Sequence, residues 1–119
     1  MKILITDDSE FMRKIIRSAL SNVAGNNEFM EAENGDVAVE LCRTFQPDIV
    51  FLDIIMPVKN GIMAMEEIKA MNPNTKVVIV TSVGQEEMIA KAQELHADDF
   101  VPKPFQPAQI VEVFQKFAI

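Results

Sequence analysis

Short apolar runs alternate along this chain with longer stretches in which apolar residues recur every three or four positions. The runs have the length and composition of β-strands, and they lie at residues 2–6, 28–32, 48–53, 76–80 and 99–101. After each run the apolar spacing changes to that of one face of an α-helix. Five such β-α units predict a parallel sheet covered by helices on both faces.

Capping and breaking residues predict where several helices begin and end. Ser9 can cap the helix after the first strand, and Gly25 with the two asparagines after it breaks the pattern of that helix. Further helices are expected at about 61–71 and 85–95, and Pro107 opens the last one.

The pair Asn34-Gly35 has two interpretations. The pair is typical of a tight β-hairpin turn. The residues after it, however, include Ala38, Leu41 and Cys42 at helical spacing. We therefore expect Asn34 to be the N-cap of a helix.

The expected fold class is α/β: a flavodoxin-like, doubly wound, five-stranded parallel sheet with five helices. The strand order 2-1-3-4-5 fits best and puts the first and third strands side by side. Residues 48–53 are nearly all apolar, as in a strand covered on both faces. The more polar run 28–32 suits one edge, and Pro102, which lacks an amide donor, suits the other.

Length and charge limit the classes of function. The 119 residues suit one domain, 1–119, and the net charge of −7 disfavours nucleic acid and anionic membranes as partners. We expect Arg13, Lys14 and Arg17 to form a solvated helix face. The chain starts directly in strand pattern, and its apolar stretches are too short to span a membrane, so we expect a cytoplasmic protein.

Cys42 and His96 are single residues of their kinds, so no internal disulfide or zinc site is expected. Cys42 has helical spacing with apolar neighbours, which favours a buried structural thiol over a reactive one. His96 follows the fourth predicted helix, where we favour a left-handed C-terminal residue over a proton shuttle.

Three acidic residues follow strands that the predicted fold makes neighbours. Asp7 and Asp8 come after the first strand, and Asp53 ends the third. Carboxylates this close repel one another, and a hard cation such as Mg²⁺ offsets the repulsion. The alternative is three solvated loop acids that never meet. Thr81 and Lys103 follow two further strands, and a carboxylate, a hydroxyl, an ammonium and a metal together suit phosphoryl transfer.

These residues give the chain a resemblance to the receiver domains of two-component response regulators, over essentially its whole length. The matching motifs are Asp7-Asp8, Asp53-Ile54-Ile55-Met56-Pro57, Gly61, Thr81-Ser82 and Lys103-Pro104-Phe105. The resemblance implies that Asp53 accepts a phosphoryl group from a sensor histidine kinase. It also implies that Asp8, Asp53 and the backbone carbonyl of Ile55 ligate Mg²⁺, with Asp7 acting through a metal-bound water.

By the same resemblance, Lys103 contacts the phosphoryl group and is joined to Pro104 by a cis peptide bond. Thr81 and Phe100 are the switch residues, although a static core role is the alternative for Phe100. The expected partner face is formed by the fourth helix, fifth strand and fifth helix, with Met88, Lys91, Phe100 and Phe114 as candidates. For Met88 and Phe114, core packing is an equal alternative.

Within the family the chain is most similar to the stand-alone chemotaxis type, which implies a monomer that binds a downstream protein. A phosphorelay intermediate and a receiver excised from a longer regulator are the alternatives. A haloacid-type phosphatase would need an acid where Ile55 stands. A degenerate receiver that acts as a phosphorylation-independent adaptor conflicts with the intact motif set.

Two apolar positions predict a long phosphoryl lifetime. In receivers, the positions of Ile55 and Val83 flank the path of the attacking water. Both are apolar here, so neither can orient that water.

Overall fold

Strands and helices alternate along the chain as the hydrophobic pattern predicts. The computed structural model describes residues 1–23, 25–82 and 84–117. Its strands are β1 (Lys2–Thr6), β2 (Glu28–Ala32), β3 (Ile49–Asp53), β4 (Lys76–Thr81) and β5 (Asp99–Pro102). Its helices are α1 (Glu10–Ser21), α2 (Gly35–Thr44), α3 (Gly61–Met71), α4 (Glu86–Glu94) and α5 (Pro107–Phe117).

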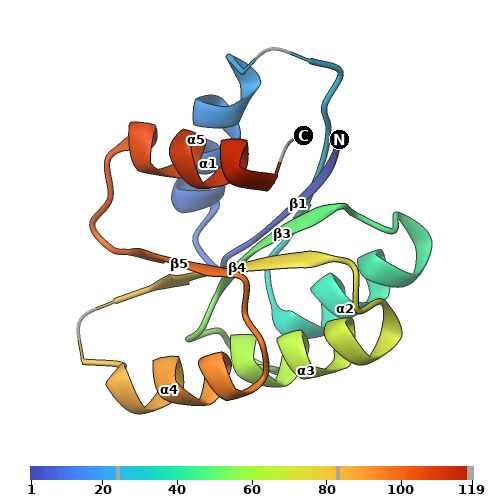
Figure 1. Ribbon diagram of the computed structural model, residues 1–119, viewed down its shortest axis with the longest axis vertical. Helices are drawn as coiled ribbons and strands as arrows, with labels where there is room; N and C mark the ends of the chain where they lie inside the picture. The colour runs from blue at the N-terminus through green and yellow to red at the C-terminus, as the bar shows by residue number, and fades with distance from the viewer. Residues whose placement is uncertain (24, 83, 118–119) are drawn as a thin grey trace.

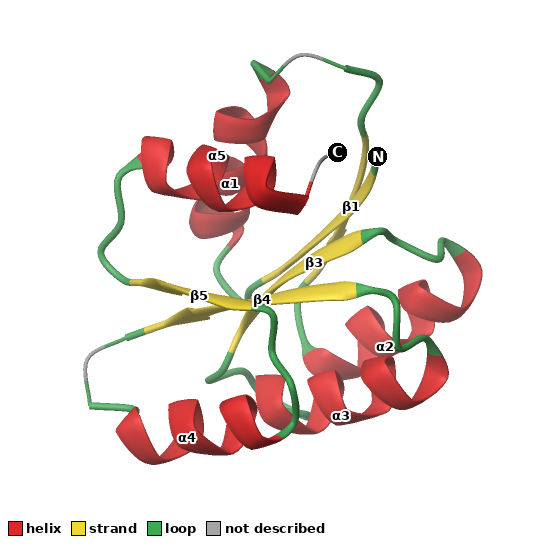
Figure 2. Cartoon of the chain, in the orientation of Figure 1, coloured by secondary structure: helices red, strands yellow, loops and turns green. Residues whose placement is uncertain are grey.

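All paired strands are parallel, and the sheet order β2-β1-β3-β4-β5 confirms the predicted topology. Helices α1 and α5 cover one face, while α2, α3 and α4 cover the other (Figures 1 and 2). The polar strand β2 and the proline-ending strand β5 lie at the two edges, as expected. None of the helices within the described residues is long and apolar enough to cross a membrane.

Strand β3 separates two apolar layers because its side chains alternate between the faces. Ile49 and Phe51 pack with α1 and α5, whereas Val50 and Leu52 pack with α2 and α3. All four side chains are fully buried. This explains why the strand reads as a continuous apolar run in the sequence.

The predicted caps at Ser9 and Asn34 are confirmed. The Ser9 hydroxyl accepts a hydrogen bond from the Met12 amide at 3.3 Å, and the Asn34 side chain accepts one from Val37 at 2.9 Å. The hairpin alternative for Asn34-Gly35 is therefore wrong. His96 has a φ of 69°, which confirms the left-handed residue after α4, and Cys42 is a buried free thiol whose pKa burial raises to about 12.

The predicted solvated basic face of α1 is wrong for Arg13. Its side chain is only 14% exposed, and its Nε lies 3.0 Å from a carboxylate oxygen of Glu31 on β2. Arg17 binds the other oxygen of the same carboxylate at 2.9 Å. The sequence pattern missed this because the pairing depends on α1 lying against a strand that follows it in the chain. Lys14 is exposed as predicted.

Gly61 lets α3 begin directly against the end of β3. Its amide donates to the Ile54 carbonyl at 2.8 Å. A Cβ at this position would lie 2.1 Å from the carbonyl oxygen of Asp53, which no side-chain carbon can do without a backbone shift. The glycine therefore fixes the path of the loop that follows Asp53.

Replacing Gly61 by alanine should lower the free energy of unfolding by about 2–3 kcal/mol, because the backbone must move to make room. Chemical denaturation measures this loss. The matched control is Gly25→Ala, where φ is +119° and no atom lies within 4 Å of the added Cβ. Only backbone strain of roughly 1–2 kcal/mol should result there. Equal losses in the two variants would contradict a packing role for Gly61.

Candidate functional site

The strand register brings four of the predicted site residues to one edge of the sheet. Thr6 pairs with Leu52, so the next residues, Asp7 and Asp53, are neighbours. Asp53 pairs with Val80, which precedes Thr81. Thr81 in turn pairs with Pro102, and Lys103 is the next residue in the chain after Pro102. The carboxyl ends of β1, β3, β4 and β5 thus form the crevice in which open α/β sheets bind ligands.

The three predicted acids meet in this crevice. One carboxylate oxygen from each of Asp7, Asp8 and Asp53 lies within 4.8 Å of the other two. Asp7 is 1% exposed and Asp53 is 4% exposed, whereas Asp8 is open to solvent. The alternative of separate, solvated loop acids is therefore wrong. Oxygen donors at this spacing, with one of them open to solvent, fit a hard divalent cation that keeps some of its water.

Lys103 lies between the two buried acids. Its ammonium is 3.0 Å from Asp7 Oδ2 and 3.4 Å from Asp53 Oδ2. Burial lowers the pKa of this lysine, but the hydrogen bond from its ammonium to Asp7 and the charge of Asp53 outweigh burial and raise it overall. The peptide bond from Lys103 to Pro104 is cis, as the resemblance implied. Lys103 is therefore charged and placed to contact an anion bound near Asp53.

The surroundings of Asp53 destabilise the ionised form of its carboxyl group. Burial and the charge of Asp7 raise its pKa to about 6, although Lys103 counteracts part of the shift. The group is still mostly ionised at neutral pH, so it can act as a nucleophile or bind a metal ion. Its charge would be better compensated by a cation in the crevice.

Two contacts that the sequence analysis missed orient Asp7. Its Oδ1 accepts a hydrogen bond from the Ser9 amide at 2.9 Å. Its backbone carbonyl accepts another from Arg13 at 2.7 Å. An aspartate two residues before a helix N-cap is the signal that predicts the first contact. The second depends on the packing of α1, and the local sequence carries no sign of it.

Thr81 is buried at the end of β4, and its hydroxyl bonds to the side chain of Gln85. Gln85 was not among the predicted site residues. Ile55, two residues after Asp53, is 52% exposed. Val83, predicted to flank the path of water, lies outside the described residues.

The predicted partner face needs one correction. Phe114 is 1% exposed and packs in the core between the sheet and α1, so it is not a surface residue. Its place on the inward stripe of α5 explains the burial. Met88 and Phe100 are partly buried against the other core layer, and Lys91 is exposed on α4.

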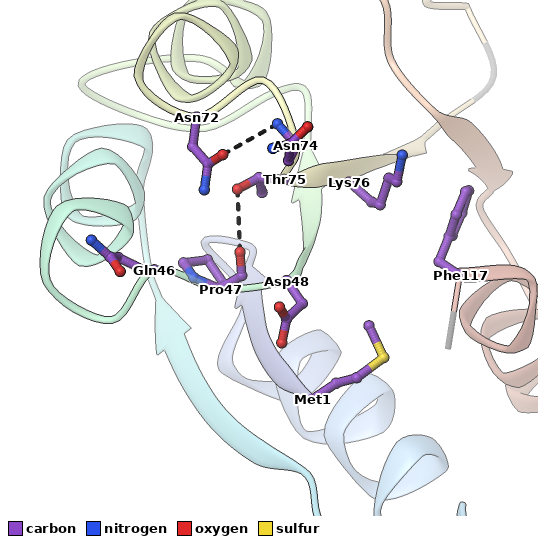
Figure 3. Close-up of a pocket in the computed structure, with 9 residues that line it drawn as sticks. All are labelled: Met1, Gln46, Pro47, Asp48, Asn72, Asn74, Thr75, Lys76 and Phe117. Carbon is purple, nitrogen blue, oxygen red and sulfur yellow. Dashed lines mark hydrogen bonds between the residues drawn. The ribbon is translucent and has the colours of Figure 1, made fainter. Parts of the chain in front are cut away.

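A second pocket lies at the opposite, amino-terminal end of the strands. It is lined by Met1, Gln46, Pro47, Asp48, Asn72, Asn74, Thr75, Lys76 and Phe117 (Figure 3). Two of its polar groups already serve the fold. Thr75 donates to the Pro47 carbonyl at 3.2 Å, and Asp48 accepts from the Lys2 amide at 2.7 Å. We therefore assign the chemistry to the acidic edge.

Comparisons with known proteins agree with this arrangement. A family model described as the response regulator receiver domain matches residues 3–115. The chemotaxis protein CheY of Thermotoga maritima is 42% identical over 115 residues, which cover 97% of this chain and 95% of that protein. CheY of Halobacterium salinarum is 41% identical, over 93% of this chain and 91% of the relative. The crystal structure of the receiver domain of NtrX from Brucella abortus superposes with a TM-score of 0.87 at 29% identity, covering 96% and 95% of the two chains.

Replacing Asp53 by asparagine should stabilise the metal-free protein at neutral pH. The folded pKa of about 6 lies above the ordinary value of 3.8, so the acid destabilises the fold increasingly as pH rises between these values. Above pH ~6.5 the cost is roughly 3 kcal/mol for a shift of this size, and below pH ~4 it disappears. Urea denaturation in the presence of a chelator, at pH 7.5 and pH 4.5, measures the gain at each pH.

The control for that experiment is Glu33→Gln, which neutralises an exposed carboxylate in the loop between β2 and α2. It should change stability little at either pH. Equal stability of Asp53→Asn and the parent protein at pH 7.5 would contradict the electrostatic cost assigned to Asp53.

Proposed function

Because the chain belongs to the response regulator receiver family, we propose that it is a signalling switch in which Asp53 accepts a phosphoryl group. The observation that carries the proposal is the placement of Asp53, buried beside two acids and a lysine at the carboxyl edge of the sheet. Receivers of this type are signalling proteins rather than classical enzymes, and the reaction proposed here takes place on the protein's own side chain.

Each residue in the crevice has a chemical role in the proposal. Asp53 is the nucleophile, and its ionised state at neutral pH supports this. Asp8, Asp53 and the backbone carbonyl of Ile55 would hold Mg²⁺, with Asp7 acting through a water molecule. When bound, Mg²⁺ supplies positive charge that offsets the carboxylates and the phosphoryl oxygens. Lys103, whose ammonium lies 3.4 Å from the Asp53 carboxylate, would contact the phosphoryl oxygens, and Thr81 would donate a hydrogen bond to one of them.

The proposed phosphoryl donor is a phosphohistidine of a sensor histidine kinase. The likeness to proteins named chemotaxis protein CheY supports a role in chemotaxis. We propose further that the protein acts in the cytoplasm and as a monomer. The proposed output is a change in the face formed by α4, β5 and α5, where Lys91 is exposed and Phe100 is half-buried. Phosphorylation would draw Thr81 towards the phosphoryl group and thereby shift the population of that face.

Incubation with acetyl phosphate and Mg²⁺ should add a single phosphoryl group to the protein. Intact-mass spectrometry detects this adduct. Asp53→Asn and a metal-free sample should both give none, because the first lacks the nucleophile and the second lacks the charge compensation. A folded protein that binds Mg²⁺ and yet gives no adduct would contradict the role assigned to Asp53.

The double substitution Ile55→Asn with Val83→Glu should shorten the lifetime of the phosphoryl group about tenfold or more, equivalent to at least ~1.4 kcal/mol in the barrier. Polar side chains at these positions could orient the attacking water, which the apolar parent residues cannot do. Decay of the phosphorylated mass after donor removal measures the lifetime.

The control for the lifetime experiment is Val58→Asn. It also replaces an exposed apolar residue of the loop between β3 and α3, but it lies further from Asp53 along the chain. This control should leave the lifetime unchanged. An unchanged lifetime in the double variant would contradict the role given to Ile55 and Val83.

A further inference from the structure

The Thr81 hydroxyl is already engaged in this structure. Its Oγ1 lies 2.9 Å from Gln85 Oε1 and 3.3 Å from the carbonyl oxygen of Ser82. The backbone amide of Ser82 also donates to Gln85 Oε1, at 3.0 Å. The side chain of Gln85 thus binds two groups at the end of β4, one of them the hydroxyl assigned to the phosphoryl group.

The chemistry of the donors fixes which atoms face each other. The Ser82 amide can only donate, so the Gln85 atom that receives it must be the carbonyl oxygen. That oxygen can only accept, so in this contact the Thr81 hydroxyl is the donor. The distance of 2.9 Å to Gln85 Oε1, against 3.3 Å to the Ser82 carbonyl, makes Gln85 the favoured acceptor. A hydroxyl has a single proton. While that proton is held by Gln85, Thr81 cannot donate to a phosphoryl oxygen.

Gln85 also connects this bond to the start of α4. It occupies the N-cap position, where its backbone carbonyl accepts from Ile89 at 2.9 Å. Its side chain makes no capping hydrogen bond to its own helix. Side chains that cap helices usually bond to the first free amides, and here the side chain instead reaches back to β4. The same residue therefore ends the β4–α4 loop and holds the Thr81 hydroxyl.

We propose that Gln85 is a positioning residue that holds the Thr81 hydroxyl in the resting state and must release it on phosphorylation. This inference rests on the proposed function. The exchange is balanced: the bond from Thr81 to Gln85 breaks, and one from Thr81 to a phosphoryl oxygen forms. Because Gln85 is the N-cap residue of α4, the exchange also removes a hydrogen bond between β4 and the start of α4. Helix α4 is the first element of the proposed partner face.

Replacing Gln85 by methionine tests this inference, because methionine has a similar length and no strong acceptor. Beryllofluoride with Mg²⁺ serves as the probe, since it mimics a phosphoryl group without transferring one. The chain has no Trp or Tyr, so amide NMR titration is the suitable readout. The half-saturating beryllofluoride concentration should fall about two- to tenfold, the equivalent of one net neutral hydrogen bond.

Repeating the substitution in a Thr81→Val background distinguishes an effect of Gln85 on the Thr81 hydroxyl from an effect of Gln85 on α4. Thr81→Val keeps the shape of the side chain and removes the proton for which the two acceptors compete. In that background, Gln85→Met should leave the half-saturating concentration unchanged. The matched control is Gln93→Met, which makes the same substitution at an exposed position of α4 and should have no effect in either background. If Gln85→Met fails to melt cooperatively, Gln85→Ala replaces it, because the position is only half-buried.

The outcomes separate this inference from the proposed function. If the parent protein binds beryllofluoride and Gln85→Met binds it no more tightly, the inference is overturned and the proposed function stands. A gain that persists in Thr81→Val would also overturn it, because Gln85 would then act through the helix rather than through the hydroxyl. Failure of the parent protein to bind beryllofluoride would reject the proposed function, and the inference with it. A gain in beryllofluoride affinity that is present with Thr81 and absent in Thr81→Val supports both the inference and the proposed function.

Discussion

Two buried carboxylates held side by side are the constraint on which the rest of this structure depends. Because the register pairs Thr6 with Leu52, the residues that follow these two strands must be neighbours. The strands cannot slip to separate the acids, since a shift of one residue would turn every core side chain to the wrong face. The apolar layers on both faces of the sheet therefore hold Asp7 beside Asp53 in spite of their repulsion.

The surroundings of the acids reduce this repulsion only in part. Lys103 reaches both carboxylates, and the Ser9 amide donates to the carboxylate of Asp7. The pKa of Asp53 nevertheless remains near 6 because the residue is buried beside another charge. A cation held between these carboxylates would relieve a repulsion that a solvated pair of acids does not have. The loop after Asp53 is constrained as well, since Val58 has a φ of 70°, which is rare for a β-branched residue.

Hydrogen bonds at the end of β4 join the acidic edge to the start of α4. The Thr81 hydroxyl has one proton, and in this structure its nearest acceptor is the side chain of Gln85, the N-cap residue of α4. The burial of Phe114 removes one aromatic residue from the expected partner face. The candidates that remain for that face are Lys91, which is exposed on α4, and Met88 and Phe100, which are half-buried on α4 and β5. The helix that begins beside Thr81 and Gln85 thus also contributes Lys91 and Met88 to the proposed partner face.

The sequence by itself determined the α/β class and the five strands and helices, because hydrophobic periodicity and capping residues such as Ser9 and Asn34 act over a few residues. The strand order could be predicted because right-handed crossovers leave few topologies for alternating strands and helices. The sequence also predicted that Asp7, Asp8, Asp53, Thr81 and Lys103 lie at one edge of the sheet, because parallel strands put their carboxyl ends there. Only the tertiary structure decided the contacts between distant segments. Arg13 and Arg17 bind Glu31 across two elements, and Phe114 turns into the core. The size of the Asp53 pKa shift likewise depends on burial and on the distances to Asp7 and Lys103, which local sequence does not specify.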